Sequence, residues 1–155
     1  MDDQFDELEK QVLARMKEIY SETVIDHAMN PRNVGSISDA DGFVAAKSRC
    51  GEVMKMWIRV KEAKIVEAAF WTDGCGATVA CGSMATELIK GKDIAEALAV
   101  SAEDICAALG GLPEGNYHCA ELAANAVKAV ARDYISTKRE PWRKAYRRNQ
   151  GFVSV

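Results

Sequence analysis

The stretch VMKMWIRVKEAKIVEAAFWTDGCGATVACGSMATELIKG, residues 53–91, decides the fold of this chain. Its first eight residues alternate between apolar and polar side chains, and every second residue from Met54 to Val60 points to the same side. This alternation is typical of a half-buried strand. Residues 64–72 continue as a second strand, and the short link between the two strands predicts an antiparallel hairpin.

The second half of the same stretch changes from strand to helix. We expect Val66, Ala68 and Phe70 to share one face of the second strand. After Asp73-Gly74-Cys75-Gly76 the apolar side chains recur with the period of a helix, and Gly91 ends that helix. The stretch therefore predicts a sheet edge that leads directly into a helix, with a cysteine at the junction.

The preceding segment, residues 3–29, is predicted to be helical, because its apolar side chains recur every three or four residues. The stripe consists of Phe5, Leu8, Val12, Met16 and Ile19. A break near Tyr20 divides this segment, and Ser21 is suited to cap a second helix. Pro31 ends that helix, and a loop-rich region with a short strand at residues 43–48 follows.

The segment after residue 91 is also predicted to be helical. A short helix at residues 93–100 is followed by a capping box from Ser101 to Asp104, and the last long helix begins near His118. This order predicts an α+β fold, in which a small antiparallel sheet of two or three strands is packed by helices. Residues 1–155 are expected to form one domain, with residues 1–19 as an N-terminal helical extension.

Composition narrows the classes of protein that fit the chain. Apolar residues make up 48% of the 155 residues and charged residues 28%, which is typical of a folded protein. No apolar run approaches the ~20 residues of a membrane span, so no membrane partner is expected. The acidic N-terminus is unlike a secretory or transit peptide, and a cytoplasmic protein is therefore expected.

Residues 138–155 form a basic C-terminal tail. Six Lys and Arg residues there stand against Glu140 alone, so the tail carries +5 and the rest of the chain −8, given the total of −3. The tail is either a solvated segment or a docking element for an acidic partner. Nucleic acid is not an expected partner, because the acidic body would repel phosphate.

The five cysteines fall into two groups. Cys81 and Cys106 lie on apolar faces of predicted helices, where a thiol packs as a small hydrophobic group. Cys50, Cys75 and Cys119 lie instead at junctions between predicted elements. An odd number of cysteines in a reducing compartment argues against a disulfide framework, so the junction cysteines are candidates for metal ligands or nucleophiles.

The three junction thiols and the imidazole of His118 are side chains of the kinds that bind metal. Cys75 and Cys119 lie at predicted helix N-termini, where the dipole favours thiolate, the form that binds metal or accepts sulfur. Soft sulfur ligands with one imidazole suit zinc or an iron–sulfur cluster. A Cys–His hydrolase fits less well, because the adjacent His118 and Cys119 are not expected to face each other on a helix. His27, in mid-helix, is expected to be structural.

These residues stand in motifs that resemble the NifU/IscU family of iron–sulfur cluster scaffold proteins, over about residues 20–135. The matching segments are Tyr20-Ser21, Val24-Ile25-Asp26-His27, Asn30-Pro31-Arg32-Asn33-Val34-Gly35, Cys50-Gly51-Glu52-Val53-Met54, Asp73-Gly74-Cys75-Gly76, Ser83-Met84-Ala85-Thr86-Glu87, Lys90-Gly91-Lys92 and His118-Cys119. The spacing from Cys75 to Cys119, with His118 present, resembles the IscU-type branch rather than the SufU-like branch.

The resemblance implies an IscU/SufE-like scaffold, not an enzyme, that assembles iron–sulfur clusters de novo. A cysteine desulfurase would deliver sulfur as a persulfide to Cys119, and iron would arrive at the same site. A labile [2Fe-2S] cluster would form on Cys50, Cys75 and Cys119, with His118 or Glu52 as the fourth ligand, and would then pass to recipient apoproteins. Glu52 stands where the family usually has Asp, and its implied role is that of a metal ligand.

The resemblance leaves several partners and functions open. Residues 112–116 read Leu-Pro-Glu-Gly-Asn where relatives served by a dedicated Hsp70-type chaperone have Leu-Pro-Pro-Val-Lys, so docking to such a chaperone is not expected. The oligomeric state, including a homodimer, is open, and zinc could fill the same ligands in the apo form. The alternative functions are a zinc-binding structural or regulatory module and a cysteine-based sulfurtransferase.

Overall fold

The computed structural model describes residues 2–146 and 153–154. In chain order its elements are α1 (Asp2–Ile19), α2 (Glu22–Met29), β1 (Gly42–Lys47), β2 (Val53–Lys61), β3 (Lys64–Thr72), α3 (Gly76–Ile89), α4 (Ile94–Leu98), α5 (Ala102–Ala108), the 3-10 turn η1 (Glu114–Asn116), α6 (Tyr117–Arg139), α7 (Arg143–Tyr146) and β4 (Val153–Ser154). This order confirms the α+β prediction. In the described part of the chain, no helix has the length and apolar character needed to cross a membrane.

The sheet has the strand order β3-β2-β1-β4. The pairs β1–β2 and β2–β3 are antiparallel, as predicted, and Met56 of β2 stands between Val44 of β1 and Phe70 of β3. The two residues of β4 add a short parallel strand beside β1. The end of the basic tail therefore lies against the sheet, although residues 147–152 and 155 fall outside the described residues.

The inner face of β3 differs from the prediction at one position. A β-bulge leaves Val66 without a partner, since Arg59 pairs with Glu67 and Val60 pairs with Ile65. An extra residue shifts the alternation of a strand by one position and so reverses which face each side chain occupies. Ile65 is accordingly buried and Val66 is exposed, so the prediction for Val66 was wrong, whereas Ala68 and Phe70 are buried as expected.

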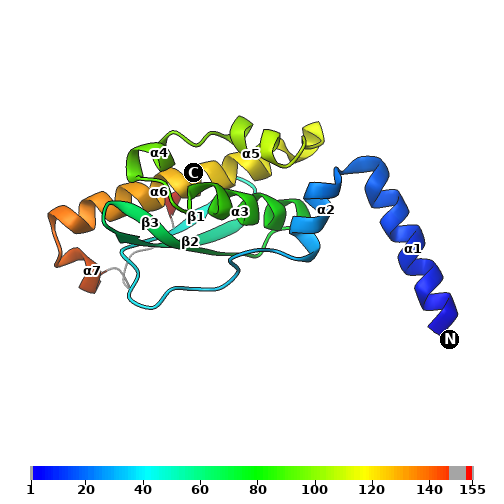
Figure 1. Cartoon of the computed structure of the whole chain (residues 1–155), viewed down its shortest axis with the longest axis horizontal. Helices are drawn as coiled ribbons and strands as arrows, with labels where there is room; N and C mark the ends of the chain where they lie inside the picture. Colours follow the sequence, from blue (N-terminus) through cyan, green and yellow to red (C-terminus); the bar gives the residue numbers. More distant parts are fainter. Residues whose placement is uncertain (1, 147–152, 155) are drawn as a thin grey trace.

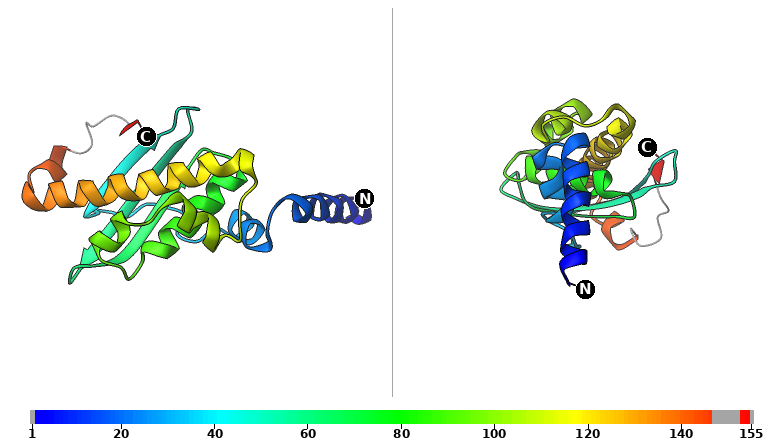
Figure 2. Two further views of the ribbon diagram at one scale, coloured as in Figure 1. Left: turned by 90° about the horizontal axis from the view of Figure 1, so that it is seen from above. Right: turned by 90° about the vertical axis from the view of Figure 1, so that its right-hand side faces the viewer.

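Helices cover one face of the sheet (Figures 1 and 2). Helices α3 and α6 pack on the strands and on each other, while α4 and α5 pack beside α6. The core lies between these layers and includes fully buried side chains of β2, α3 and α6: Met54, Met56, Ile58, Ile89 and Val127. This packing fixes the start of α3 and the start of α6 close to the β1–β2 turn.

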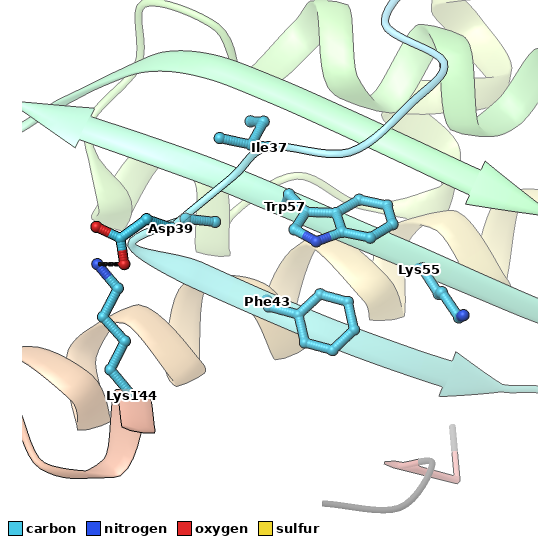
Figure 3. Close-up of a pocket in the computed structure, with 7 residues that line it drawn as sticks. Ile37, Asp39, Phe43, Lys55, Trp57 and Lys144 are labelled. Atoms are coloured by element: carbon cyan, nitrogen blue, oxygen red, sulfur yellow. Dashed lines mark ion pairs between the residues drawn. The ribbon is translucent and has the colours of Figure 1, made fainter. Parts of the chain in front are cut away.

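The other face of the sheet carries an open hollow of about 300 Å3 (Figure 3). Phe43 and Trp57 line it with ring centroids 5.2 Å apart, and Lys55 stands beside them. At its edge, Lys144 of α7 forms an ion pair with Asp39 at 2.9 Å, which ties the start of the basic tail to the body. None of the predicted ligand residues lines this hollow.

Helix α1 projects away from the body, and Ser21 begins α2 as predicted (Figure 1). The Ser21 hydroxyl accepts a hydrogen bond from the Val24 N–H at 3.1 Å, which is the expected N-cap. The predicted apolar stripe of α1 is present, but the helix buries no side chain. Its exposed members are Phe5, Leu8, Val12 and Ile19. The stripe thus contributes nothing to the core that positions the site.

Candidate metal centre

The turn between β1 and β2 presents two candidate ligands. The Ser48 N–H donates to the Glu52 carbonyl at 2.8 Å, and the Gly51 N–H donates to the Ser48 carbonyl at 3.0 Å. Gly51 has φ of +89°, a conformation that residues with a side chain rarely adopt. The closed turn leaves Cys50 exposed and Glu52 partly exposed, so both side chains can reach a metal at this end of the sheet.

The junction between β3 and α3 is fixed to the start of β2. The Asp73 carboxylate accepts a hydrogen bond from the Val53 N–H at 2.8 Å, and the Thr72 hydroxyl donates to the Val53 carbonyl at 2.7 Å. Cys75 follows as the N-cap residue of α3 and is exposed, as predicted. Its thiol is therefore held at the same end of the sheet as the β1–β2 turn.

The environment of Cys75 favours its thiolate. Burial raises the pKa of Cys75, but hydrogen bonds from the Thr78 hydroxyl and from the backbone N–H groups of Thr78 and Ala77 outweigh it. The net result is a pKa below the ordinary thiol value. These N–H groups belong to the first turn of α3, so the helix N-terminus acts on the sulfur as the sequence predicted.

Cys119 lies in the first turn of α6 and is fully buried, at 0% exposure. Burial raises its pKa to about 11, although the hydrogen bond from the Thr78 hydroxyl opposes that shift. The exposed His118 turns its Nε2 to within 3.6 Å of the Cys119 Sγ. The prediction that these neighbours do not face each other was wrong, because the His118 side chain reaches back to the sulfur of the next residue.

The structure gathers most of the predicted ligands at one point. Among the described residues, ligand atoms of Glu52, His118 and Cys119 lie within 4.8 Å of one another. Cys75 joins them through the Thr78 hydroxyl, which lies 3.5 Å from the Cys75 Sγ and 3.3 Å from the Cys119 Sγ. Three separate elements thus supply thiol, imidazole and carboxylate to one centre.

Cys50 stands at the edge of this centre rather than inside it. Together with His118 it lines a cleft of about 620 Å3 that runs between α5 and the first half of α6. The cleft carries charges of both signs, from Arg49, Lys128 and Glu121 among others. An incoming group in the cleft would therefore contact Cys50 and His118.

The remaining predicted roles are structural. Cys81 is fully buried, and burial raises its pKa, while Cys106 is partly buried against the core. The Nδ1 of His27 lies 2.7 Å from the Ser83 hydroxyl, which confirms a structural histidine. The Asn33 side chain in turn donates to the Thr86 hydroxyl at 3.0 Å. The motifs at residues 30–35 and 83–87 therefore brace α3 against the loop after α2.

Thr78 is the residue at this centre that the sequence did not single out. It lies on the buried face of α3, where a threonine ordinarily signals nothing beyond packing. The signal available was its position one helical turn after Cys75, which places both side chains on the same face of the helix.

Comparison with known proteins agrees with the sequence resemblance. A family model described as the NifU-like N terminal domain matches residues 19–141. The chain is 47% identical over 118 residues to the iron–sulfur cluster assembly scaffold protein IscU 1 of Archaeoglobus fulgidus, with 76% of this chain and 77% of that protein covered. It is 48% identical over 127 residues to the scaffold protein IscU of Escherichia coli K12, with 78% and 97% covered.

Solved structures give the same fold. A NifU-like protein (N-terminal) from Brucella abortus matches with a TM-score of 0.51 at 19% identity, with 79% of this chain and 83% of that chain covered. At this identity the match bears on the arrangement of helices and strands alone.

Proposed function

The chain belongs to the family of NifU-like N-terminal domains and is a scaffold for iron–sulfur cluster assembly, and we propose that it builds a labile [2Fe-2S] cluster at the centre described above. One observation carries the site: Glu52, His118 and Cys119 present ligand atoms within 4.8 Å of one another, beside Cys75. Thiolate and imidazole are the ligands that hold such clusters.

We propose Cys50, Cys75 and Cys119 as the thiolate ligands, with His118 or Glu52 completing the set. Cys50 lies in an exposed turn on the wall of the same cleft as His118, and we propose that this turn moves to bring its sulfur to the centre. Ligands on turns and junctions at an open rim are more accessible to a recipient protein than ligands fixed in a core. This arrangement favours transfer of the cluster over its storage.

The sulfur step fits the contact between His118 and Cys119. We propose that the imidazole, 3.6 Å from the sulfur, takes the thiol proton of Cys119. The resulting thiolate then attacks the outer sulfur of a persulfide carried by a cysteine desulfurase. A new S–S bond forms on Cys119, the bond between the two donor sulfurs breaks, and the desulfurase cysteine leaves as a thiolate. The cleft beside Cys50 offers the donor segment a route to the site.

The same proposal covers partners and setting. The scaffold would receive sulfur from a desulfurase, pass its cluster to recipient apoproteins and turn over no small molecule itself. Its five cysteines are all free, which fits a reducing compartment such as the cytoplasm. Zinc could occupy the same ligands in the purified protein. We further propose that residues 1–155 act as one scaffold domain, extended by α1 and by the basic tail.

Anaerobic reconstitution tests the ligand set. Iron, a sulfur source and a desulfurase should give visible charge-transfer absorption, which zinc cannot give, together with measurable iron and sulfide per chain. Cys50→Ser, Cys75→Ser and Cys119→Ser should each abolish a stable cluster. Cys81→Ala and Cys106→Ala are the matched controls and should retain it. An unchanged cluster yield in any of the three serine variants would remove that residue from the ligand set.

A further inference from the structure

The side chain of Thr78 contacts three of the candidate ligands at once. Its hydroxyl donates toward the Cys119 Sγ at 3.3 Å and toward the Glu52 Oε2 at 3.5 Å, and it lies 3.5 Å from the Cys75 Sγ. The residue is fully buried, at 0% exposure. A buried hydroxyl that points at three ligands is not needed for packing, since a valine would fill the same space.

The Thr78 hydroxyl cannot act as the donor in all three of these contacts at the same time. A threonine hydroxyl has one proton to donate and two lone pairs with which to accept. Its one proton can therefore serve Cys75, Cys119 or Glu52 but not all three, while its lone pairs can accept from the Cys75 thiol when that thiol is protonated. The three ligands come from the β1–β2 turn, from α3 and from α6, so this one group links all three elements.

The neighbouring residue Gly74 leaves space for the hydroxyl. A Cβ at position 74 would lie 2.7 Å from the Cβ, Cγ2 and Oγ1 of Thr78, closer than such atoms approach. The Gly74 N–H is itself held by the Thr72 hydroxyl at 3.1 Å. The backbone before α3 is therefore shaped so that the Thr78 side chain can reach the centre.

Thr86, on the same helix, shows what a buried threonine does without this role. It is also fully buried, but the single proton of its hydroxyl is shared between the carbonyls of Gly82 and Ser83, at 3.0 and 2.8 Å, along its own helix. It has no part in the metal centre. Thr86 is thus a matched control for any effect that follows from the loss of a buried hydroxyl alone.

We propose that Thr78 is a positioning residue of the scaffold: before metal arrives its hydroxyl positions Cys75 together with Cys119 or Glu52, and once metal is bound it donates a hydrogen bond to the sulfur of Cys119. The proposal rests on the ligand set proposed above. Removal of a group that hydrogen-bonds a metal ligand typically weakens metal binding by about 10–100-fold. It also leaves the thiolate richer in electrons, which moves its charge-transfer band to longer wavelength.

Cobalt(II) titration of the full metal-free chain under anaerobic conditions tests the role, with a competing chelator to measure affinity and absorption spectra to report on the thiolates. Thr78→Val should bind Co2+ about 10–100-fold more weakly and shift the sulfur-to-metal band to longer wavelength. Thr78→Ser keeps the hydroxyl and should restore both the affinity and the band. Thr86→Val should match the parent in both, whatever its melting temperature.

A second variant covers the case in which Thr78→Val does not fold. Gly74→Ala keeps every hydroxyl but displaces the Thr78 side chain, and it should show the same weakening and the same shift. Parent-like affinity in Thr78→Val, or equal weakening in Thr86→Val, would overturn the role of Thr78. Parent-like Co2+ binding in both Cys75→Ser and Cys119→Ser would instead overturn the proposed ligand set, so the two failures are distinguishable.

Discussion

The metal-free protein should show a large difference in reactivity between the thiols of Cys75 and Cys119. Cys75 is exposed and has a lowered pKa, whereas Cys119 is fully buried with a pKa raised to about 11. The ordinary value is 9.0. At pH 7.5 a thiol with the ordinary value is about 3% thiolate, and one with a pKa of about 11 is about 0.03%. Protonation alone therefore makes the reaction of Cys119 about 100-fold slower than that of a thiol with the ordinary pKa, before steric protection by burial is considered.

Iodoacetamide labelling followed by mass spectrometry of the peptides measures this difference. Metal-free protein under anaerobic conditions would be labelled at a series of pH values from 7 to 9.5, with the exposed Cys50 as an internal reference. Because only thiolate reacts, the rate at Cys119 should rise about tenfold for each pH unit across the whole range. The rate at Cys75 should pass half of its maximum below pH 9, because its pKa is lowered from the ordinary value.

Two outcomes would refute the reasoning. Labelling of Cys119 within about tenfold of Cys75 at pH 7.5 would show that burial does not hold its proton. A plateau in the Cys119 rate below pH 9 would show the same. Either result would mean that the Cys119 thiol reacts without help from His118 or an incoming metal.

Two further predictions concern the packing around the centre. Gly82→Ala should lower the melting temperature by about 2–12 °C, because the new Cβ would lie 2.5 Å from the buried Phe70 ring and such overpacking costs about 1–3 kcal/mol. Gly115→Ala is the control, because nothing lies within 4 Å of a Cβ at that position. An unchanged melting temperature in Gly82→Ala would contradict the packing. Burial lowers the pKa of His27 below 6.5, so as the pH falls the unfolded chain takes up a proton before the folded chain does. The free energy of unfolding should therefore be at its full value above pH 6.5 and should decrease as the pH drops below 6.5. Denaturant unfolding from pH 5 to 8 should show a smaller fall for His27→Gln than for the parent or for His118→Gln, and equal slopes would rule out His27 as the cause.

The sequence predicted the elements well because its local signals agree with the tertiary structure. The alternation in β2, the cap at Ser21 and the cysteine before α3 all appear where expected. The bulge at Val66 could not be foreseen, because an extra residue in a strand depends on how the partner strand pairs. The stripe on α1 was visible as well, but periodicity shows which side of a helix is apolar and not whether anything covers it.

The candidate site was predictable by residue type and not by geometry. Thiols at element junctions beside glycine indicated Cys75 and Cys119, and the structure brings both to the Thr78 hydroxyl. The approach of His118 to Cys119 depends on the torsion angles of the His118 side chain, which spacing along the sequence does not reveal. Thr78 itself was missed because its role arises only when three distant segments meet.

The projecting helix α1 has a consequence for how this protein behaves in solution. Its 18 residues extend ~27 Å from the body, at about 1.5 Å per residue. A body with such an arm experiences more friction than a sphere of the same 16.9 kDa mass, so it diffuses more slowly and leaves a size-exclusion column early. Elution volume alone would therefore overstate the mass of the monomer, and light scattering, which reports mass without regard to shape, is the measurement that gives the oligomeric state.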